Sequence, residues 1–272
     1  MADAIAWHSR TVTAEHTDAD RRAAEHALVT PAPSLEAALE GAEYVQESGP
    51  ESLEAKRAIF RSLARHAEPE AILASSTSVI DMTDIADGIA TAHRCIVAHP
   101  VNPPHVVPVV EVLGGRDTSP EVVECTMRWL QGVGQVPVRL NYYVPGFLLN
   151  RMQAALVREA VDLVARGVAS VDDVDAVIRD GLGLRWAFLG PFGTADTNAD
   201  AGARDYFARY GPSYESLWRD LRTNVHFDEA LLERIERERE PMTRGRTPDE
   251  RRAWRDRAVT ALRTLKLELA KH

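Results

Sequence analysis

Short apolar segments and segments with helical spacing alternate through the first half of the chain. Strand-like segments occupy residues 43–47, 71–75, 95–98, 106–112 and 136–140. Between them, residues 51–67 and 119–132 carry apolar side chains at helical spacing, and residues 80–89 contain a short helix. Strands that alternate with helices predict an open parallel α/β sheet.

The pattern changes after Pro145, where strand signals end. Residues 146–166 predict a long helix, Ser170 and Asp173 cap a helix over residues 171–179, and residues 181–193 read as a loop. Thr247 is the expected N-cap of the last helix, with Pro248 at its first position and Glu250 at its third, the pattern of a capping box. We therefore expect an α/β domain over residues 1–141 and an all-helical domain over residues 142–272.

The N-terminal part of the chain has weaker signals. Residues 1–30 are polar and alanine-rich, with short helical stretches, and residues 27–30 could form a brief strand. Ser34 is the expected N-cap of a short helix that follows.

The stretch from Cys95 to Glu111 carries the strongest candidate chemistry. An apolar strand ends at His99, and the prolines that follow indicate that the sheet gives way to a loop. Glu111 lies in the next apolar run, where a buried carboxylate needs a partner. A His–Glu pair suits acid–base work at neutral pH, although a structural histidine with a salt-bridged glutamate is the alternative interpretation.

Other polar side chains follow neighbouring strands. Glu47 and Ser78 lie, like His99, at or just past the carboxyl ends of predicted strands. Ligands gather at this edge of parallel sheets, so the clustering favours a functional site.

Composition excludes several classes of protein. The net charge of −9 argues against general nucleic-acid binding, and no apolar segment is long enough to cross a membrane. The N-terminus lacks the pattern of a secretory signal. Cys95 and Cys125 are too few for a disulfide framework or a zinc site, so we expect reduced cysteines, no bound metal and a cytoplasmic location.

Four ordered motifs carry a family resemblance: CIVAHPVNPP, VVEV, VPGFLLNRMQ and GLGLRWAFLGP. Together they resemble the lambda-crystallin type of L-gulonate 3-dehydrogenase, within the 3-hydroxyacyl-CoA dehydrogenase superfamily. The similarity runs from about Leu35 to the C-terminus. It implies a Rossmann-like sheet, a helical substrate and dimerisation domain, NAD as cofactor and a homodimer.

The resemblance also implies roles for single residues. His99 resembles the catalytic base that takes the hydroxyl proton, and Glu111 the carboxylate that orients it. Ser78 and Asn150 resemble hydrogen-bond donors to the reacting oxygen. The alternative for these two residues is a helix cap or a helix–helix hydrogen bond.

Residues at cofactor and substrate positions follow from the same resemblance. Glu51, Lys56 and Asn102 match positions that contact the dinucleotide, although Lys56 could simply lie on a solvated helix face. Arg185 suits a substrate carboxylate, which a guanidinium holds in bidentate fashion, or a structural ion pair.

The chain departs from the family at its N-terminal part. Family members open with a strand, a G-x-G-x-x-G turn and a helix, whereas the only glycine before Ser48 is Gly41. About forty-five residues, one strand–helix–strand unit with the start of the next helix, are missing relative to the family. The Rossmann-like sheet is therefore expected to be incomplete, with residues 43–47 left as an apolar edge.

This departure leaves two explanations open: the sequence starts internally to a longer protein, or it is a natural shortened paralogue. We expect NAD-linked oxidation of a small L-gulonate-like hydroxy acid, weak or absent in this chain. The alternatives are a 3-hydroxyacyl-CoA dehydrogenase and, from another class, a non-catalytic dimerising or binding protein.

Overall fold

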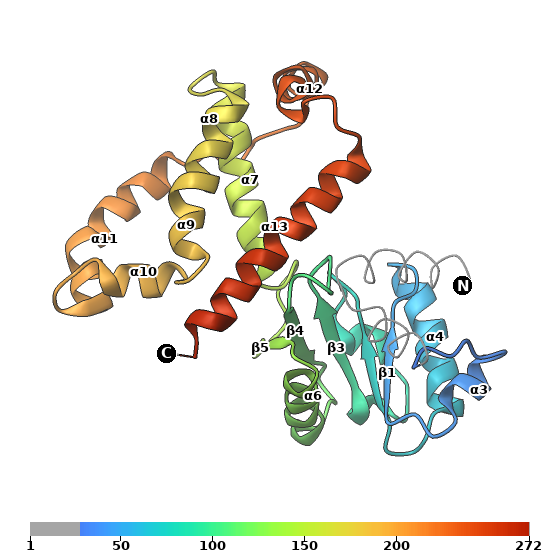
Figure 1. Ribbon diagram of the computed structural model, residues 1–272. Coiled ribbons are helices and arrows are strands. Elements are labelled where there is room, and N and C mark those ends of the chain that lie inside the picture. Colours follow the sequence, from blue (N-terminus) through green and yellow to red (C-terminus); the bar gives the residue numbers. More distant parts are fainter. Residues whose placement is uncertain (1–27, 272) are drawn as a thin grey trace. The chain divides into compact units, whose positions relative to one another are not determined.

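Five strands form one sheet in the computed structural model, which describes residues 28–271 (Figure 1). The strands are β1 (Tyr44–Glu47), β2 (Ile72–Ser75), β3 (Cys95–Pro100), β4 (Val109–Gly114) and β5 (Val136–Arg139). They lie side by side in this same order. The predicted strand positions are confirmed to within three residues at each end.

The direction of β4 differs from the all-parallel expectation. β1, β2 and β3 are parallel, but β4 runs antiparallel to β3, and β5 is parallel to β4. The reason is the connection between β3 and β4, residues 101–108, which is shorter than the dozen or so residues that a parallel crossover needs. The antiparallel register sets His99 directly opposite Glu111.

Side chains alternate along each strand, so each strand presents apolar residues to both faces of the sheet, and helices cover both faces. On one face Leu73, Val97 and Leu113 pack in a core with residues of α4 (Leu53–His66) and α5 (Met82–Ile85). On the other face Ala74, Ile96 and Val112 pack with residues of α6 (Pro120–Gly132). His99 and Glu111 lie on the first face, in step with Val97 and Leu113.

β1 is the outer strand of the sheet that residues 28–271 form. Its Tyr44 ring stacks on Trp129 of α6 at a centroid distance of 4.1 Å, so part of its apolar surface is covered. Burial raises the pKa of the Tyr44 hydroxyl, which donates to Gln46 at 2.7 Å. The short helices α3 (Leu35–Leu39) and η1 (Ala92–Arg94) flank β1 and β3 in sequence, and Ser34 caps α3 as predicted.

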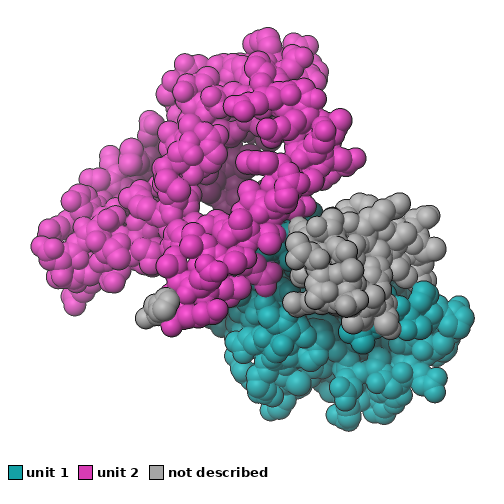
Figure 2. All heavy atoms as spheres, in the orientation of Figure 1, with its two compact units in different colours: residues 1–151 teal, residues 152–272 magenta. Residues whose placement is uncertain are grey.

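The chain divides into two compact units, which meet in the sequence between Arg151 and Met152 (Figure 2). Helix α7 (Leu149–Ala165) begins in the first unit and continues in the second. The remaining helices of the second unit are α8 (Val171–Ala176), η2 (Val177–Leu182), α9 (Gly183–Trp186), α10 (Pro191–Thr197), α11 (Gly202–Asp220), α12 (Glu229–Thr243) and α13 (Pro248–Leu269).

A small apolar core of Val161, Val164, Val171 and Leu231 joins α7, α8 and α12. The capping box at Thr247 and Glu250 is confirmed at the start of α13.

Most of residues 181–193 are helical, contrary to the predicted loop: only residues 187–190, between α9 and α10, are irregular. The helix that begins at Val171 widens into the π-turn η2, in which Gly183 donates its N–H to the carbonyl of Ile178. A Cβ at residue 183 would lie only 2.6 Å from that oxygen. Glycine therefore permits the wide turn here, where sequence rules treat it as a break.

The expectations for residues 1–27 lie outside the part of the chain that the structure describes, and the brief strand expected over residues 27–30 is not found at residues 28–30, which are a turn and irregular backbone. Within residues 28–271, no helix combines the length and apolar character that a membrane span requires. Cys95 is buried, Cys125 is exposed, and both thiols are free.

Candidate active site

The His99 and Glu111 side chains meet at the carboxyl end of β3. His99 Nδ1 lies 2.9 Å from Glu111 Oε2, and both residues are buried. Their backbones are directly paired across the antiparallel strands, which brings side chains on the same face together. A one-residue change in register would separate the pair.

Glu111 is also tied to the start of α7. Its Oε1 accepts hydrogen bonds from the backbone N–H groups of Leu148, at 2.8 Å, and Leu149, at 2.9 Å. Burial favours the neutral acid, but the hydrogen bonds from His99 and from the two amides outweigh it and lower the pKa of Glu111 below its ordinary 4.5. The glutamate is therefore an ionised acceptor at neutral pH.

An ionised carboxylate only accepts hydrogen bonds, so the shared proton lies on His99 Nδ1. The other ring nitrogen, Nε2, is then the one with a lone pair when the ring is neutral. Among residues 28–271, Nε2 makes no hydrogen bond of its own. This arrangement leaves the basic atom available to a ligand.

Ser78 and Asn150 lie close to each other. The side-chain amide of Asn150 donates to the carbonyl of Ser78 at 3.4 Å, and Asn150 is the second residue of α7. The neighbouring Val79 carbonyl accepts from the Tyr143 hydroxyl at 2.9 Å. The turn after β2 is thus held to the start of α7, and the Ser78 hydroxyl itself has no hydrogen bond within the described residues.

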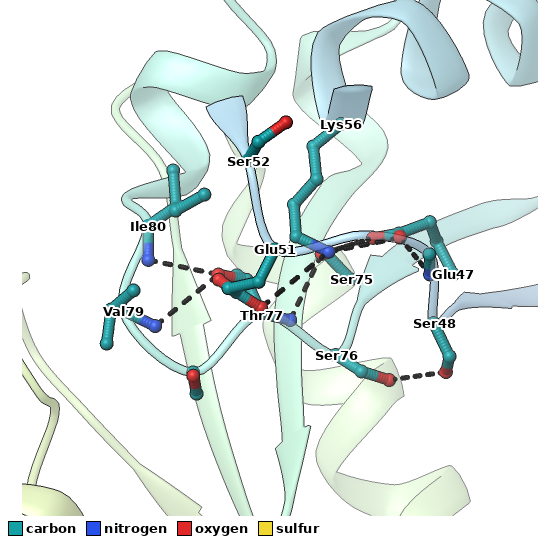
Figure 3. Close-up of polar contacts among 12 residues, drawn as sticks. Glu47, Ser48, Glu51, Ser52, Lys56, Ser75, Ser76, Thr77, Val79 and Ile80 are labelled. Carbon is teal, nitrogen blue, oxygen red and sulfur yellow. Dashed lines mark hydrogen bonds and ion pairs between the residues drawn. The ribbon is translucent and has the colours of Figure 1, made fainter. Parts of the chain in front are cut away.

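A second buried pair lies at the ends of β1 and β2 (Figure 3). Lys56 Nζ of α4 lies 3.0 Å from both carboxylate oxygens of Glu47, with the two side chains only 1% and 3% exposed. Glu47 also accepts from Ser75 Oγ at 2.6 Å. This burial excludes the solvated helix face considered for Lys56.

Gly49 completes the surroundings of Glu47. Its N–H donates to Glu47 Oε1, and a Cβ at this position would lie 2.9 Å from that oxygen and 2.7 Å from Ile59 Cδ1. Glycine therefore allows the backbone to approach the carboxylate. Sequence reasoning placed Glu47 at a strand end but missed this pairing with Lys56.

Glu51 and Thr77 link the pair to the turn that carries Ser78. Glu51 Oε1 accepts from Thr77 Oγ1, and its Oε2 lies 3.9 Å from Lys56 Nζ. Thr77 Oγ1 in turn accepts from the N–H groups of Val79, at 3.4 Å, and Ile80, at 3.0 Å (Figure 3). The Glu51 side chain is 40% exposed, so it is the member of this cluster that can contact a ligand. Thr77 was missed from the sequence, where the only signal was its place in the polar run SSTS.

Asn102 and Arg185 are exposed. Asn102 lies two residues after the end of β3. Arg185 lies on α9 in the second unit and forms no ion pair with a carboxylate among the described residues, while its charge acts on the hydroxyl of Tyr206. A structural ion pair for Arg185 is thus not found in residues 28–271.

With this geometry in place, comparison with known proteins decides the family. Residues 2–143 match the NAD binding domain of 3-hydroxyacyl-CoA dehydrogenase, and residues 146–232 match its C-terminal domain. The chain belongs to the 3-hydroxyacyl-CoA dehydrogenase family. Its relatives place it on the lambda-crystallin side of that family.

The lambda-crystallin homolog of Bos taurus is 40% identical over 248 residues, covering 89% of this chain and 76% of that protein. The L-carnitine dehydrogenase of Streptomyces coelicolor is 39% identical over 227 residues, covering 83% and 71%. Among solved structures, an NAD+-dependent 5-formyl-3-hydroxy-2-methylpyridine 4-carboxylic acid 5-dehydrogenase aligns with a TM-score of 0.73 and 30% identity, covering 86% of this chain and 76% of that one.

NAD is the cofactor of this family. Glu51 follows β1, Ser78 follows β2 and His99 lies near the end of β3, at the edge of the sheet where α/β folds bind ligands. Their polar groups suit the nicotinamide end of such a ligand. The pyrophosphate end fits less well, since no G-x-G-x-x-G sequence occurs anywhere in the 272 residues.

Proposed function

We propose that this chain is an NAD-dependent dehydrogenase of small 3-hydroxy acids of the L-gulonate type. The observation that carries the proposal is the His99–Glu111 pair, with Nδ1 held by the carboxylate and Nε2 without a hydrogen bond among residues 28–271. That is the arrangement a histidine general base needs.

In the proposed reaction, His99 Nε2 takes the proton of the substrate's 3-hydroxyl group. The imidazole becomes positively charged, and the buried Glu111 carboxylate stabilises that charge at 2.9 Å. Glu111 is itself held by the amides of Leu148 and Leu149 where α7 begins, so it keeps the orientation of the ring fixed. When bound, NAD supplies the acceptor for the hydride that leaves the same carbon.

We assign Ser78 and Asn150 to the reacting oxygen. Ser78 lies in the turn after β2 and Asn150 at the start of α7, and the hydrogen bond between these two residues holds the two segments together. Hydrogen-bond donors fixed in advance stabilise the negative charge that develops on this oxygen.

For the cofactor we assign Glu51, Lys56 and Asn102. The Glu51 side chain is the exposed one of the cluster, and it accepts a hydrogen bond from a ligand hydroxyl. The Lys56 ammonium is paired with Glu47 and acts on the ligand through its contact with Glu51. Arg185 is assigned to the substrate carboxylate; its exposure on α9 and the lack of a carboxylate partner among residues 28–271 support this.

The domain roles and the assembly extend the proposal. Residues 1–141 serve the cofactor, and residues 142–272 serve the substrate and a homodimer contact. Exposed apolar side chains in the second unit support the dimer; they include Tyr210, Leu217, Trp218, Trp254 and Leu265. Free cysteines support a cytoplasmic location. Sedimentation velocity tests the dimer. The wild-type chain is expected to sediment as a dimer, and Trp218→Glu is expected to shift the distribution toward monomer. A wild-type chain that sediments as a monomer would reject the dimer.

Activity of this chain alone is expected to be weak or absent, because the glycine-rich phosphate turn is not part of its sequence. The test is a fusion that adds the strand–turn–helix of a lambda-crystallin homolog, assayed for NADH formation with L-gulonate, L-carnitine and 3-hydroxybutyryl-CoA. Turnover of L-gulonate is expected, and His99→Asn should abolish it. His93→Asn, which changes an exposed histidine outside the site, should keep the turnover of the unaltered fusion.

The outcomes separate the alternatives. Turnover of the CoA ester in preference to both small acids would favour a 3-hydroxyacyl-CoA dehydrogenase. A folded fusion that binds NAD and turns over nothing, with every property unchanged in His99→Asn, would favour a non-catalytic binding protein.

A further inference from the structure

Phe147 has an unusual backbone for a large side chain. Its φ angle is +50°, in the left-handed region that aromatic residues rarely adopt, and its side chain is fully buried. It follows Gly146, whose φ is +77°, and precedes the first turn of α7. Strained residues of this kind persist where the surrounding structure holds them, and they concentrate at functional sites.

The ring of Phe147 lies edge-on to the ring of His99. Their centroids are 5.7 Å apart with an interplanar angle of 62°, and Phe147 also meets Tyr143 at 6.2 Å and 83°. A ring packed in this way restricts rotation of the imidazole about its χ angles.

The backbone of Phe147 serves the same dyad from the other side. The left-handed turn points the next two N–H groups, of Leu148 and Leu149, at Glu111 Oε1. One residue thus constrains both members of the dyad: its ring faces the base, and its backbone aims the donors that hold the carboxylate.

We propose that Phe147 is a positioning residue for the His99–Glu111 dyad, fixing the imidazole so that Nε2 faces the ligand. This inference rests on the proposed function, because it assigns Phe147 a role in the reaction that His99 performs. It is separable from that function in experiment, since the order of the imidazole can be observed without turnover.

A matched control exists in the same core. Phe60 of α4 is also fully buried and belongs to the same apolar cluster, yet none of its ring contacts involves His99. Phe60→Leu and Phe147→Leu therefore remove the same atoms from the same core. Phe147→Met, which fills irregular gaps better, is the second variant if Phe147→Leu melts without cooperativity.

The measurement is the solvent exchange rate of the His99 Nδ1 proton by NMR on the whole chain, assigned through its loss in His99→Asn. Because an aromatic contact restrains the ring beyond burial alone, we expect exchange about three- to tenfold faster in Phe147→Leu or Phe147→Met. Phe60→Leu should leave the rate at the wild-type value.

Equal rates in wild type and both Phe147 variants would overturn the inference, as would the same acceleration in Phe60→Leu. If the fusion described above turns over no hydroxy acid while the exchange difference remains, the proposed function fails and the positioning role stands. If turnover occurs and the rates are equal, only the positioning role fails.

Discussion

Residues 28–151 of the first unit contain two buried carboxylates, Glu47 and Glu111, each with a basic partner. They differ in whether that partner has a second nitrogen left for a ligand. The Glu47 carboxylate accepts two hydrogen bonds from the Lys56 ammonium and further ones from the Ser75 hydroxyl and the Gly49 N–H. Glu111 takes one bond from the imidazole of His99 and two from backbone amides.

The difference lies in the second nitrogen of the imidazole. A lysine side chain has a single nitrogen, and as an ammonium that nitrogen only donates hydrogen bonds, so it offers no basic atom to a ligand. A histidine can be held at Nδ1 and still present Nε2. The comparison teaches that two similarly buried and paired carboxylates can differ in whether the partner keeps an unpaired basic atom, at strand ends that lie two strands apart.

Removing the charge of Glu111 should have the largest effect on catalysis. In the NAD-binding fusion, Glu111→Gln is expected to lower kcat about a thousandfold, because the imidazole loses its orienting charge. Glu47→Gln, which changes the other carboxylate in the same way, should leave kcat within about threefold of the unaltered fusion. Comparable losses of kcat in both variants would remove the distinction between the two clusters.

Breaking the lysine pair should have the largest effect on stability. Lys56→Met leaves the Glu47 carboxylate buried without its cation, and the free energy of unfolding should fall by about 3–5 kcal/mol. Urea denaturation of the double variant Glu47→Gln/Lys56→Met checks the cause. The double variant should recover most of the loss, and a loss equal to that of the single variant would contradict this explanation.

A smaller loss is expected at Ser75. Ser75→Ala removes the hydroxyl that donates to Glu47 at 2.6 Å, leaving the lysine pair in place. The cost should be about 1–3 kcal/mol in the free energy of unfolding by urea denaturation. Ser76→Ala, next in the chain but in partly exposed contact with Ser48 and Gln46, should cost less than Ser75→Ala.

The smallest effect concerns pH. Because hydrogen bonds outweigh burial and lower the pKa of Glu111, its contribution to stability is present above its unfolded pKa of 4.5 and lost as pH falls through the lower folded pKa. The difference in unfolding free energy between wild type and Glu111→Gln should therefore shrink between about pH 6 and about pH 3. A difference that grows on acidification would contradict the assigned direction.

Much of the fold could be predicted from the sequence, since short apolar runs and helical spacing mark strands and helices wherever packing agrees with them. The direction of β4 could not be inferred from its own residues, because an apolar run has no direction. The short connection of residues 101–108 was the available signal. The π-turn before Gly183 was hidden because glycine normally ends a helix.

The site divides in a similar way. His99 and Glu111 could be paired from residue types and a family resemblance, because a buried carboxylate needs a partner. The Lys56–Glu47 pair and the Phe147 backbone could not, since both depend on how α4 and the turn before α7 pack on the sheet. Sequence spacing carries no information about such tertiary contacts.

The central claim is that Glu111 holds the proton of His99 on Nδ1 and leaves Nε2 as the base. Long-range 1H–15N correlation of the His99 ring in the whole chain at about pH 8 tests it most directly, where a free imidazole is neutral. The account predicts a protonated Nδ1 and an unprotonated Nε2, with this preference lost in Glu111→Gln. A proton on Nε2 in the wild-type protein would contradict it, since that atom could then not accept the substrate's proton.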